Sequence, residues 1–301
     1  MEFISKKQEV LGSQIEIFLP KTTKNNAKLF RLCFDELIRI QNKFSRFKDT
    51  STLNKLNKNL ELWQKVDAEF LYLIKKSLEI QKKTNGYFDI TLKSTLENLG
   101  YDKEYSFQKK EISNFTKIKS KIKFLLFLPI KINDKTSQIY LRKEIELGGI
   151  GKGYALDRVY AILETNKVEN FLINAGGDIR CKSNGEKEWI TLLQHPDNLN
   201  KVIGEININN LAIAGSAPSY RKWNSNHHLI NPKTNLPQKS VKTIFVLANT
   251  GIEADTYATA LFASGFKNAI IISKKLNLEI LVISSENKIY KSNNFNVKLY
   301  N

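Results

Sequence analysis

The chain is poor in cysteine and histidine and has no long apolar run. Of its 301 residues, two are cysteine and three are histidine, and no C-x-x-C pair occurs. This scarcity argues against a zinc site or a disulfide framework, so Cys33 and Cys181 are expected to be small buried apolar groups. No apolar run approaches the roughly 20 residues that a membrane-spanning helix needs.

The sequence shows no pattern typical of a leader or a linker. Residues Met1–Lys7 lack the basic-then-apolar layout of a secretory signal, and no lipoprotein cysteine follows. We therefore expect a cytoplasmic protein; the alternative is an exported or membrane-associated one whose signal is missing from this chain. Without internal repeats or a long Pro/Ser-rich linker, residues 1–301 are expected to form one domain, or two intimately packed α/β subdomains.

Acidic residues are outnumbered, 30 against 47 Lys and Arg, giving a formal charge of +17. Much of the excess is lysine scattered among asparagines, as in Lys21–Lys28 and Lys55–Asn59. A further basic stretch, Lys109–Lys123, lacks the interleaved aromatic residues of a base-stacking platform. We interpret the charge as solvated lysine surface and expect no nucleic-acid partner.

Apolar periodicity and turn residues predict an α+β chain with mixed or mainly antiparallel sheets and packed helices. A helical stripe of Leu29, Cys33, Leu37, Ile40 and Phe44 is the clearest signal. The predicted helices are Asn25–Phe47, Val66–Lys83 (ending before Asn85-Gly86), Lys93–Leu99, Tyr154–Leu163, Glu253–Ala263 and Lys267–Leu276. The predicted strands are 13–19, Ile139–Leu147, Asn170–Ile173, Glu188–Leu193, Ile206–Ile213, Thr243–Ala248, Glu279–Ser284 and one near Val297.

The segment Glu146-Leu-Gly-Gly-Ile-Gly-Lys-Gly-Tyr154 joins a predicted strand to a predicted helix. Glycines let the backbone approach a ligand closely, and free amides at a helix start, with Lys152, favour an anion such as phosphate. The spacing is neither a Walker loop nor a G-x-G-x-x-G fingerprint. The competing interpretation is a tight strand-to-helix turn.

Asp255 and Thr259 are spaced i, i+4 on a predicted helix and therefore share one face. A carboxylate and a hydroxyl one turn apart offer two hard oxygen ligands to Mg²⁺. The alternative for Asp255 is an N-terminal capping interaction. His227-His228 suggests a general base toward a hydroxyl nucleophile, and the alternative there is a surface turn with an incidental histidine pair.

Three loops complete the pattern. In Asn85–Thr91, Tyr87 or Phe88 would cover a flat ring and Asp89 would accept a hydrogen bond from it, unless Asp89 only caps the next segment. Asn174-Ala-Gly-Gly-Asp178 indicates a turn or bulge. Small residues, Gly215-Ser216-Ala217-Pro218, lead into Tyr220, Arg221 and Trp223.

Taken in order, these segments resemble the ApbE family of FAD:protein FMN transferases, and the resemblance covers nearly the whole chain. The matching motifs are Phe44–Asn54, Gly86–Thr91, Glu146–Asp157, Ala175–Ile179, His228–Pro232 and Glu253–Ala260. The resemblance implies an ApbE-like (T-fold-like) α+β architecture. It also implies Mg²⁺-dependent transfer of the FMN half of FAD to a threonine hydroxyl in the flavinylation motif of a target flavoprotein, releasing AMP.

Carried over to this chain, the resemblance assigns roles to individual positions. The side chains of Asp255 and Thr259 would bind the metal, together with main-chain carbonyls of Gly149 and Ala258, and His228 would be the catalytic base. The residues expected to line the FAD site are Leu11, Phe47, Tyr87, Phe88, Asp89, Glu146, Lys152 and Ile230.

Four positions depart from the family pattern. Gly215–Pro218 replaces Thr-Ser-Gly, Asn231 and Glu146 each replace an aspartate, and Gly151 replaces an alanine. These changes bear on substrate preference and rate more than on fold. The same residues leave two alternatives open, an FAD pyrophosphatase giving FMN and AMP, and a non-catalytic FAD-binding protein. Hard oxygen ligands do not distinguish Mg²⁺ from Mn²⁺.

Overall fold

The computed structural model describes residues 1–101, 128–185, 188–219, 221–223 and 226–300. The basic stretch Lys109–Lys123 and Tyr220 lie outside these ranges. The helices are α1 (Asn26–Phe44), α2 (Thr52–Asn57), α3 (Ala68–Lys83), α4 (Lys93–Asn98), α5 (Gly148–Thr165), α6 (Gly251–Ser264) and α7 (Phe266–Leu276). Within the described residues, none of these helices has the length and apolar character needed to cross a membrane.

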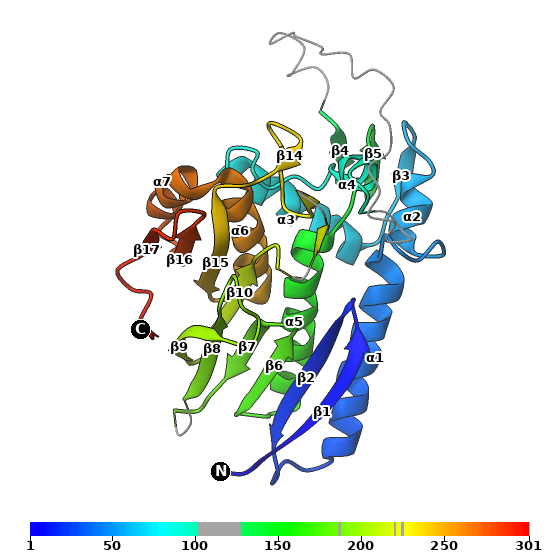
Figure 1. The fold of residues 1–301 in the computed structure, drawn as a ribbon. Coiled ribbons are helices and arrows are strands. Elements are labelled where there is room, and N and C mark those ends of the chain that lie inside the picture. The colour runs from blue at the N-terminus through cyan, green and yellow to red at the C-terminus, as the bar shows by residue number, and fades with distance from the viewer. Residues whose placement is uncertain (102–127, 186–187, 220, 224–225, 301) are drawn as a thin grey trace.

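An eight-stranded sheet runs through the centre of the molecule (Figure 1). Its strand order is β1 (Phe3–Val10), β2 (Ser13–Pro20), β6 (Phe171–Ala175), β7 (Asp178–Lys182), β10 (Ala212–Ser216), β15 (Val241–Ala248), β16 (Glu279–Ser284) and β17 (Ile289–Lys291). All seven neighbouring pairs are antiparallel. The expectation of an α+β fold with mainly antiparallel sheets is confirmed.

Smaller sheets flank this centre. One has the order β18 (Val297–Leu299), β9 (Val202–Ile208) and β8 (Trp189–Gln194), and another has β3 (Trp63–Lys65), β5 (Gln138–Leu141) and β4 (Ile130–Asn133). Two short hairpins pair β11 (Lys222–Trp223) with β12 (Asn226–His227) and β13 (Ile230–Asn231) with β14 (Leu236–Pro237).

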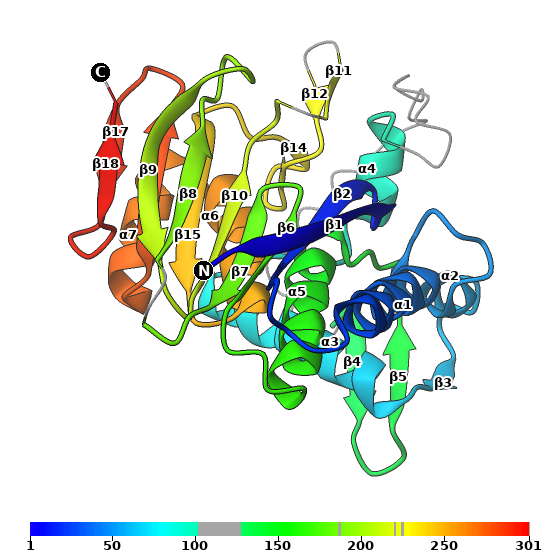
Figure 2. The same ribbon diagram turned by 90° about the horizontal axis from the view of Figure 1, so that it is seen from below.

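The central sheet separates two apolar cores. In β10, Ala212 and Ala214 join the larger core with the helices, whereas Ile213 joins a smaller core with β8 and β9. This alternation is the period of two expected for a strand buried on both faces. Figure 2 shows the arrangement, with β8 and β9 on one side of the sheet and α5 and α6 on the other.

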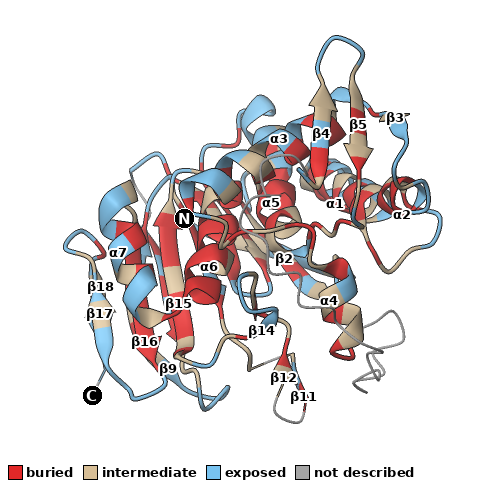
Figure 3. Ribbon diagram, turned by 90° about the horizontal axis from the view of Figure 1, so that it is seen from above, coloured by how far each residue is buried: buried red, intermediate tan, exposed pale blue. Residues whose placement is uncertain are grey.

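The helices differ in how much of their surface is buried. The predicted apolar stripe of α1 is buried as expected, and the exposed residues of α1 lie outside this stripe. By contrast, α6 is buried almost all round, which Figure 3 shows as a nearly continuous red ribbon. Such a helix belongs to the interior, and groups on it are held in place by packing from every side.

The glycine segment does not fold as predicted. A strand was expected over Ile139–Leu147 and a helix from Tyr154, but β5 ends at Leu141 and α5 begins at Gly148. The glycines therefore lie in the first turns of α5 rather than in a loop before it. Glycine disfavours a helix by about 1 kcal/mol relative to alanine, and packing against α6 overrides this preference.

A second correction concerns the predicted strand Ile206–Ile213. It is two strands in different sheets, β9 and β10, separated by a turn in which Asn210 has φ of 54°. Asparagine tolerates this left-handed conformation better than most residues, so Asn210 indicates a turn. The apolar residues on both sides of it led to the prediction of one continuous strand. The strand β1 and the helix α2 were also not predicted.

Candidate active site

The glycine segment and the Asp-Thr helix lie directly against each other. An ideal Cβ placed on Gly153 would be 2.3 Å from the carbonyl oxygen of Gly251, and one on Gly251 would be 2.5 Å from the carbonyl oxygen of Gly153. Any larger side chain at either position would push the helices apart. The two glycines therefore permit main-chain contact between the first turns of α5 and α6.

Asp255 and Thr259 face the start of α5. The Asp255 side chain is buried, and its Oδ2 accepts a hydrogen bond from the Gly153 amide at 2.8 Å. The N-cap of α6 is Thr250, whose side chain accepts from the Glu253 amide, so the capping alternative for Asp255 is wrong. Burial, with the nearby Asp178 carboxyl, raises the pKa of Asp255 to about 7. A bound cation would stabilise its ionised form.

Gly149 lies against Thr259 at the crossing. An ideal Cβ on Gly149 would lie 3.2 Å from Thr259 Oγ1, so the two residues are in contact. In a regular helix the Gly153 amide would donate to the Gly149 carbonyl, but here it donates to Asp255. Ala258 lies on α6 next to Thr259 and is itself buried.

These residues fit a hard cation. The described part of the chain contains no group of three His, Cys, Asp or Glu side chains suited to a metal. A cation at the crossing would therefore be held by one carboxylate, one hydroxyl and main-chain oxygens, with phosphate oxygens of a ligand completing the set. Mg²⁺ is characteristically bound in this way, by few protein carboxylates and substrate phosphates.

Lys152 points toward a partner that the sequence analysis did not assign to the site. Its Nζ forms an ion pair with Asp178 Oδ2, and Asp178 Oδ1 accepts from the Gly215 amide at 3.1 Å. Burial lowers the pKa of Lys152, but the carboxyls of Asp178 and Asp255 outweigh it, so the pKa is raised. Asp178 follows the two-residue turn Gly176-Gly177, both with positive φ, as the turn interpretation predicted.

Asp157 is a second residue without a predicted role. Its carboxylate accepts from the amides of Gly251 at 2.6 Å and Ile252 at 3.0 Å, which are orphan donors at the start of α6. It also forms an ion pair with Arg180. Asp157 therefore links α5, α6 and the central sheet, and it fixes the helix that carries Asp255.

Glu146 precedes α5 and is held by its main chain. Its amide donates to the Ile90 carbonyl at 2.8 Å, and its Oε2 accepts from the Gly148 amide at 2.8 Å. Burial raises the pKa of Glu146, and the charges of Arg46 and Arg221 oppose that rise. The longer side chain thus folds back onto the helix start that it precedes.

The three residues Tyr87–Asp89 play different parts. Phe88 is 3% exposed and packs on Gly149, so Tyr87 is the more accessible of the two aromatic residues predicted to cover a ligand ring. Asp89 Oδ1 accepts from both the amide and the hydroxyl of Thr91 at 2.8 Å, as in the capping alternative. The Tyr87 ring remains half-exposed, with Lys233 Nζ 4.0 Å from its centroid.

The adjacent histidines differ sharply. His227 Nε2 donates to the Gln238 carbonyl at 2.9 Å and its Nδ1 accepts from the Leu229 amide at 3.2 Å, so both nitrogens serve the fold. His228 Nδ1 is buried and has no hydrogen-bond partner among the residues that the structure describes. Burial and then the charge of Arg221 lower the pKa of His228 to about 3, which leaves the ring neutral at pH 7.

A small apolar cluster lies next to His228. It contains Ile230, Tyr101 and Trp223, with Phe47 packed at its edge. Tyr101 and Trp223 stack with centroids 5.8 Å apart, and the His228 ring is 6.0 Å from that of Tyr101. Two predicted site residues, Phe47 and Ile230, are thus brought together with the histidine.

Leu11 lies in the turn between β1 and β2 at the margin of this region. It has φ of 58°, and its amide donates to Gln41 Oε1 at 2.6 Å. The next residue, Gly12, is close to Arg221: an ideal Cβ on Gly12 would lie 3.9 Å from a guanidinium nitrogen. Arg221 was noted in the sequence only as the end of a loop.

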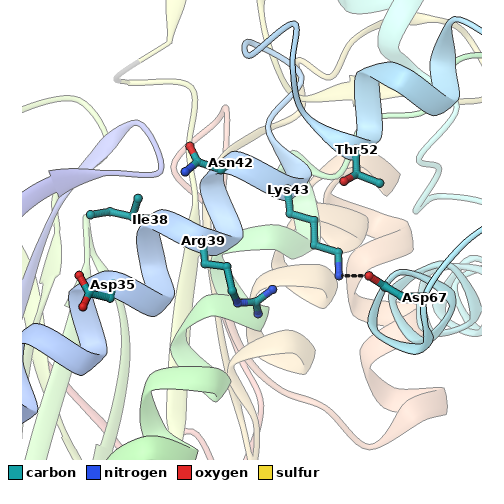
Figure 4. Close-up of a pocket in the computed structure, with 7 residues that line it drawn as sticks. All are labelled: Asp35, Ile38, Arg39, Asn42, Lys43, Thr52 and Asp67. Carbon is teal, nitrogen blue, oxygen red and sulfur yellow. Dashed lines mark hydrogen bonds and ion pairs between the residues drawn. The ribbon is translucent and has the colours of Figure 1, made fainter.

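A surface hollow of about 560 Å³ lies elsewhere, between α1 and the starts of α2 and α3 (Figure 4). It is lined by Asp35, Ile38, Arg39, Asn42, Lys43, Thr52 and Asp67. None of these is a predicted site residue. Its cations are already engaged, since Lys43 Nζ is 2.5 Å from Asp67 and Arg39 pairs with Glu69. Its two cationic side chains are therefore less available to a ligand than the groups at the helix crossing.

The fold and this site define a class of α+β protein in which two helices cross beside an antiparallel sheet and bring a buried aspartate and a threonine against a glycine-rich helix start. Solved structures share the architecture. An ApbE protein from Thermotoga maritima superposes with a TM-score of 0.86 at 24% identity, covering 98% of each chain. A flavin transferase ApbE from Vibrio cholerae gives 0.81 at 19% identity over 98% of each chain.

Sequence comparison identifies the family within this class. The family model described as ApbE matches residues 11–282, so the chain belongs to the ApbE family. A FAD:protein FMN transferase of Buchnera aphidicola (subsp. Schizaphis graminum) is 28% identical over 96% of this chain and 88% of its own length. One of Haemophilus influenzae is 26% identical over 81% and 75%. These relatives are named as transferases, in agreement with the expected enzyme class.

Proposed function

We propose that this chain is a Mg²⁺-dependent FAD:protein FMN transferase. It would move the FMN half of FAD to a threonine hydroxyl of an acceptor flavoprotein and release AMP. The observation that carries the proposal is the helix crossing, where Asp255, Thr259 and Gly149 meet and the Gly153 amide is turned toward Asp255. The names of the relatives support the same reaction.

The metal would be held by the side chains of Asp255 and Thr259 with the main-chain carbonyls of Gly149 and Ala258. When bound, Mg²⁺ neutralises charge on the diphosphate oxygens. The protein's part is to hold these oxygen ligands rigidly on two buried helices, so that little reorganisation accompanies the reaction. Lys152, tied to Asp178, would add positive potential beside the phosphates without competing for Asp255.

His228 would accept the proton of the attacking threonine hydroxyl. The threonine oxygen forms a bond to the phosphorus of the FMN half, the phosphoanhydride bond to AMP breaks, and the hydroxyl proton passes to the imidazole. The ring is neutral at pH 7 and its Nδ1 has no partner. A pKa near 3 makes a weak base, but bound phosphate would raise it toward the working range.

The test is an assay of covalent flavin transfer. The protein is incubated with FAD, Mg²⁺ and an acceptor carrying a threonine flavinylation motif, and flavin fluorescence is read on a denaturing gel. Labelled acceptor that disappears when Mg²⁺ is chelated is the expected result. FMN and AMP without labelled acceptor would instead establish the pyrophosphatase alternative, and intact bound FAD would establish a binding protein.

A further inference from the structure

Arg221 is a cation near the candidate site that pairs with no carboxylate among the described residues. Lys152 is bound to Asp178, and Arg46 donates to the Tyr101 carbonyl at 2.9 Å with Glu97 at 3.7 Å. The Arg221 guanidinium forms no ion pair with any residue that the structure describes; its ring contact is with Tyr101, at 5.9 Å from the centroid. A guanidinium that pairs with no described carboxylate is available to a ligand.

The position of Arg221 is defined from three sides. It approaches Gly12 in the turn between β1 and β2, where a Cβ would lie 3.9 Å from a guanidinium nitrogen. It shares the Tyr101 ring with His228, whose own centroid is 6.0 Å from that ring. Its charge also acts on the pKa values of Glu146 and Asp255. Arg221 therefore lies beside the predicted base, and its charge reaches the carboxyl groups of Glu146 and Asp255.

We infer that Arg221 binds the phosphate of the FMN half of FAD, the group that is transferred. This inference rests on the proposed function, because it takes His228 as the group nearest the attacked phosphorus. A cation beside that histidine is beside the same phosphorus. The planar guanidinium fork matches two phosphate oxygens at once, which a lysine ammonium cannot do.

Equilibrium binding separates a phosphate contact from a contact with the flavin ring. Riboflavin and FMN differ by one phosphate, so the ratio of their Kd values, measured by calorimetry with Mg²⁺ present, reports that group alone. In Arg221→Gln we expect the Kd for FMN to rise about tenfold or more, as for loss of a charge-assisted hydrogen bond. The Kd for riboflavin should stay within twofold, and Arg221→Lys should fall between.

The matched control is Lys222→Gln, which removes the same charge one residue away from an exposed side chain. It should leave both Kd values unchanged. Melting curves of all three variants show whether the fold is retained. The inference would be overturned if Arg221→Gln weakened the binding of riboflavin and FMN equally, or if it left the Kd for FMN unchanged.

Flavin transfer by the unsubstituted protein is measured in parallel, so that the two proposals fail separately. Absence of transfer from FAD would count against the proposed function. Normal transfer, with the same FMN-to-riboflavin ratio in Arg221→Gln as in the unsubstituted chain, would count against the role of Arg221 only. Failure of the unsubstituted protein to bind FMN more tightly than riboflavin would also reject that role.

Discussion

Asp255 and Thr259 lie on a helix that is buried along most of its length, whereas His228 lies between two hairpins whose strands have two residues each. The first region is fixed by main-chain contact between glycines of α5 and α6. In the second, the His227 side chain holds the two hairpins together, because its Nε2 donates to the Gln238 carbonyl and its Nδ1 accepts from the Leu229 amide. Binding geometry and fold are therefore inseparable at the crossing but separable at the hairpins.

The largest effect is expected from breaking the crossing itself. In Gly153→Ala, the new methyl group would meet the Gly251 carbonyl at 2.3 Å and Asp255 Cβ at 2.8 Å. Overpacking of this kind costs about 3 kcal/mol, and it would also displace the metal ligands. We expect a lower urea midpoint and loss of flavin transfer together.

The matched control for that change is Gly151→Ala in the same helix. A Cβ there meets nothing within 4 Å. Alanine favours a helix over glycine by about 1 kcal/mol, so this variant should be as stable as the unsubstituted chain or more stable, and active. Equal destabilisation by the two substitutions would refute the close contact between α5 and α6.

Asp255→Asn tests the metal side without disturbing its packing. Loss of a principal charged ligand should lower flavin transfer by about 10³-fold, in line with other electrostatic anchors. The same substitution should raise the stability of the metal-free fold. The folded-state pKa of Asp255 is raised from 3.8 to about 7, so its contribution to stability is complete below pH 3.8 and is lost as pH rises through 7.

Metal-free urea unfolding at pH 5 and pH 8 measures this contribution. The unsubstituted chain should lose more stability between these values than Asp255→Asn, and added Mg²⁺ should restore stability at pH 8 only in the unsubstituted chain. The same pH dependence in both proteins, with no response to Mg²⁺, would remove Asp255 as the ligand.

The role of the two hairpins is tested by comparing two variants, one that lacks His228 and one that lacks His227. His228→Ala should lower transfer by about 10²-fold, the usual contribution of a general base, and should destabilise the fold less than His227→Ala, because Nδ1 has no partner among the described residues. His227→Ala leaves two main-chain groups without their partners and should cost about 2 kcal/mol of stability. Transfer rates at saturating FAD and urea midpoints distinguish them; undiminished transfer by His228→Ala would exclude it as the base.

The parts of this comparison that the sequence predicts are those governed by local patterns. The apolar stripe on α1 and the end of α3 before Asn85-Gly86 depend on neighbours within one or two turns, and both are found. Asn85 has the positive φ that ends such a helix. The start of α5 was missed because its glycines oppose a helix locally. Their packing partner, Gly251, is about a hundred residues away.

The site shows the same limit. Asp255 and Thr259 could be predicted from i, i+4 spacing, but Asp178 and Asp157 act through partners on other elements, Lys152 and the start of α6. The sequence also leaves Tyr87 and Phe88 as alternatives, because neither residue type nor neighbours reveal which side of a loop faces the core. Spacing identifies groups that share a face, and only the fold identifies what that face meets.

The smallest effect is expected at Asn231, where the family pattern has an aspartate. Its Oδ1 accepts from the Lys233 amide at 2.9 Å, and a carboxylate accepts that bond equally well. Asn231→Asp should therefore change stability by less than about 0.5 kcal/mol, as for a surface substitution, and transfer by less than about twofold. Urea midpoints and initial rates measure both. A tenfold change in rate would mean that the hairpin carries charge-dependent contacts with the substrate, and the separation between fold and chemistry on this side of the site would no longer hold.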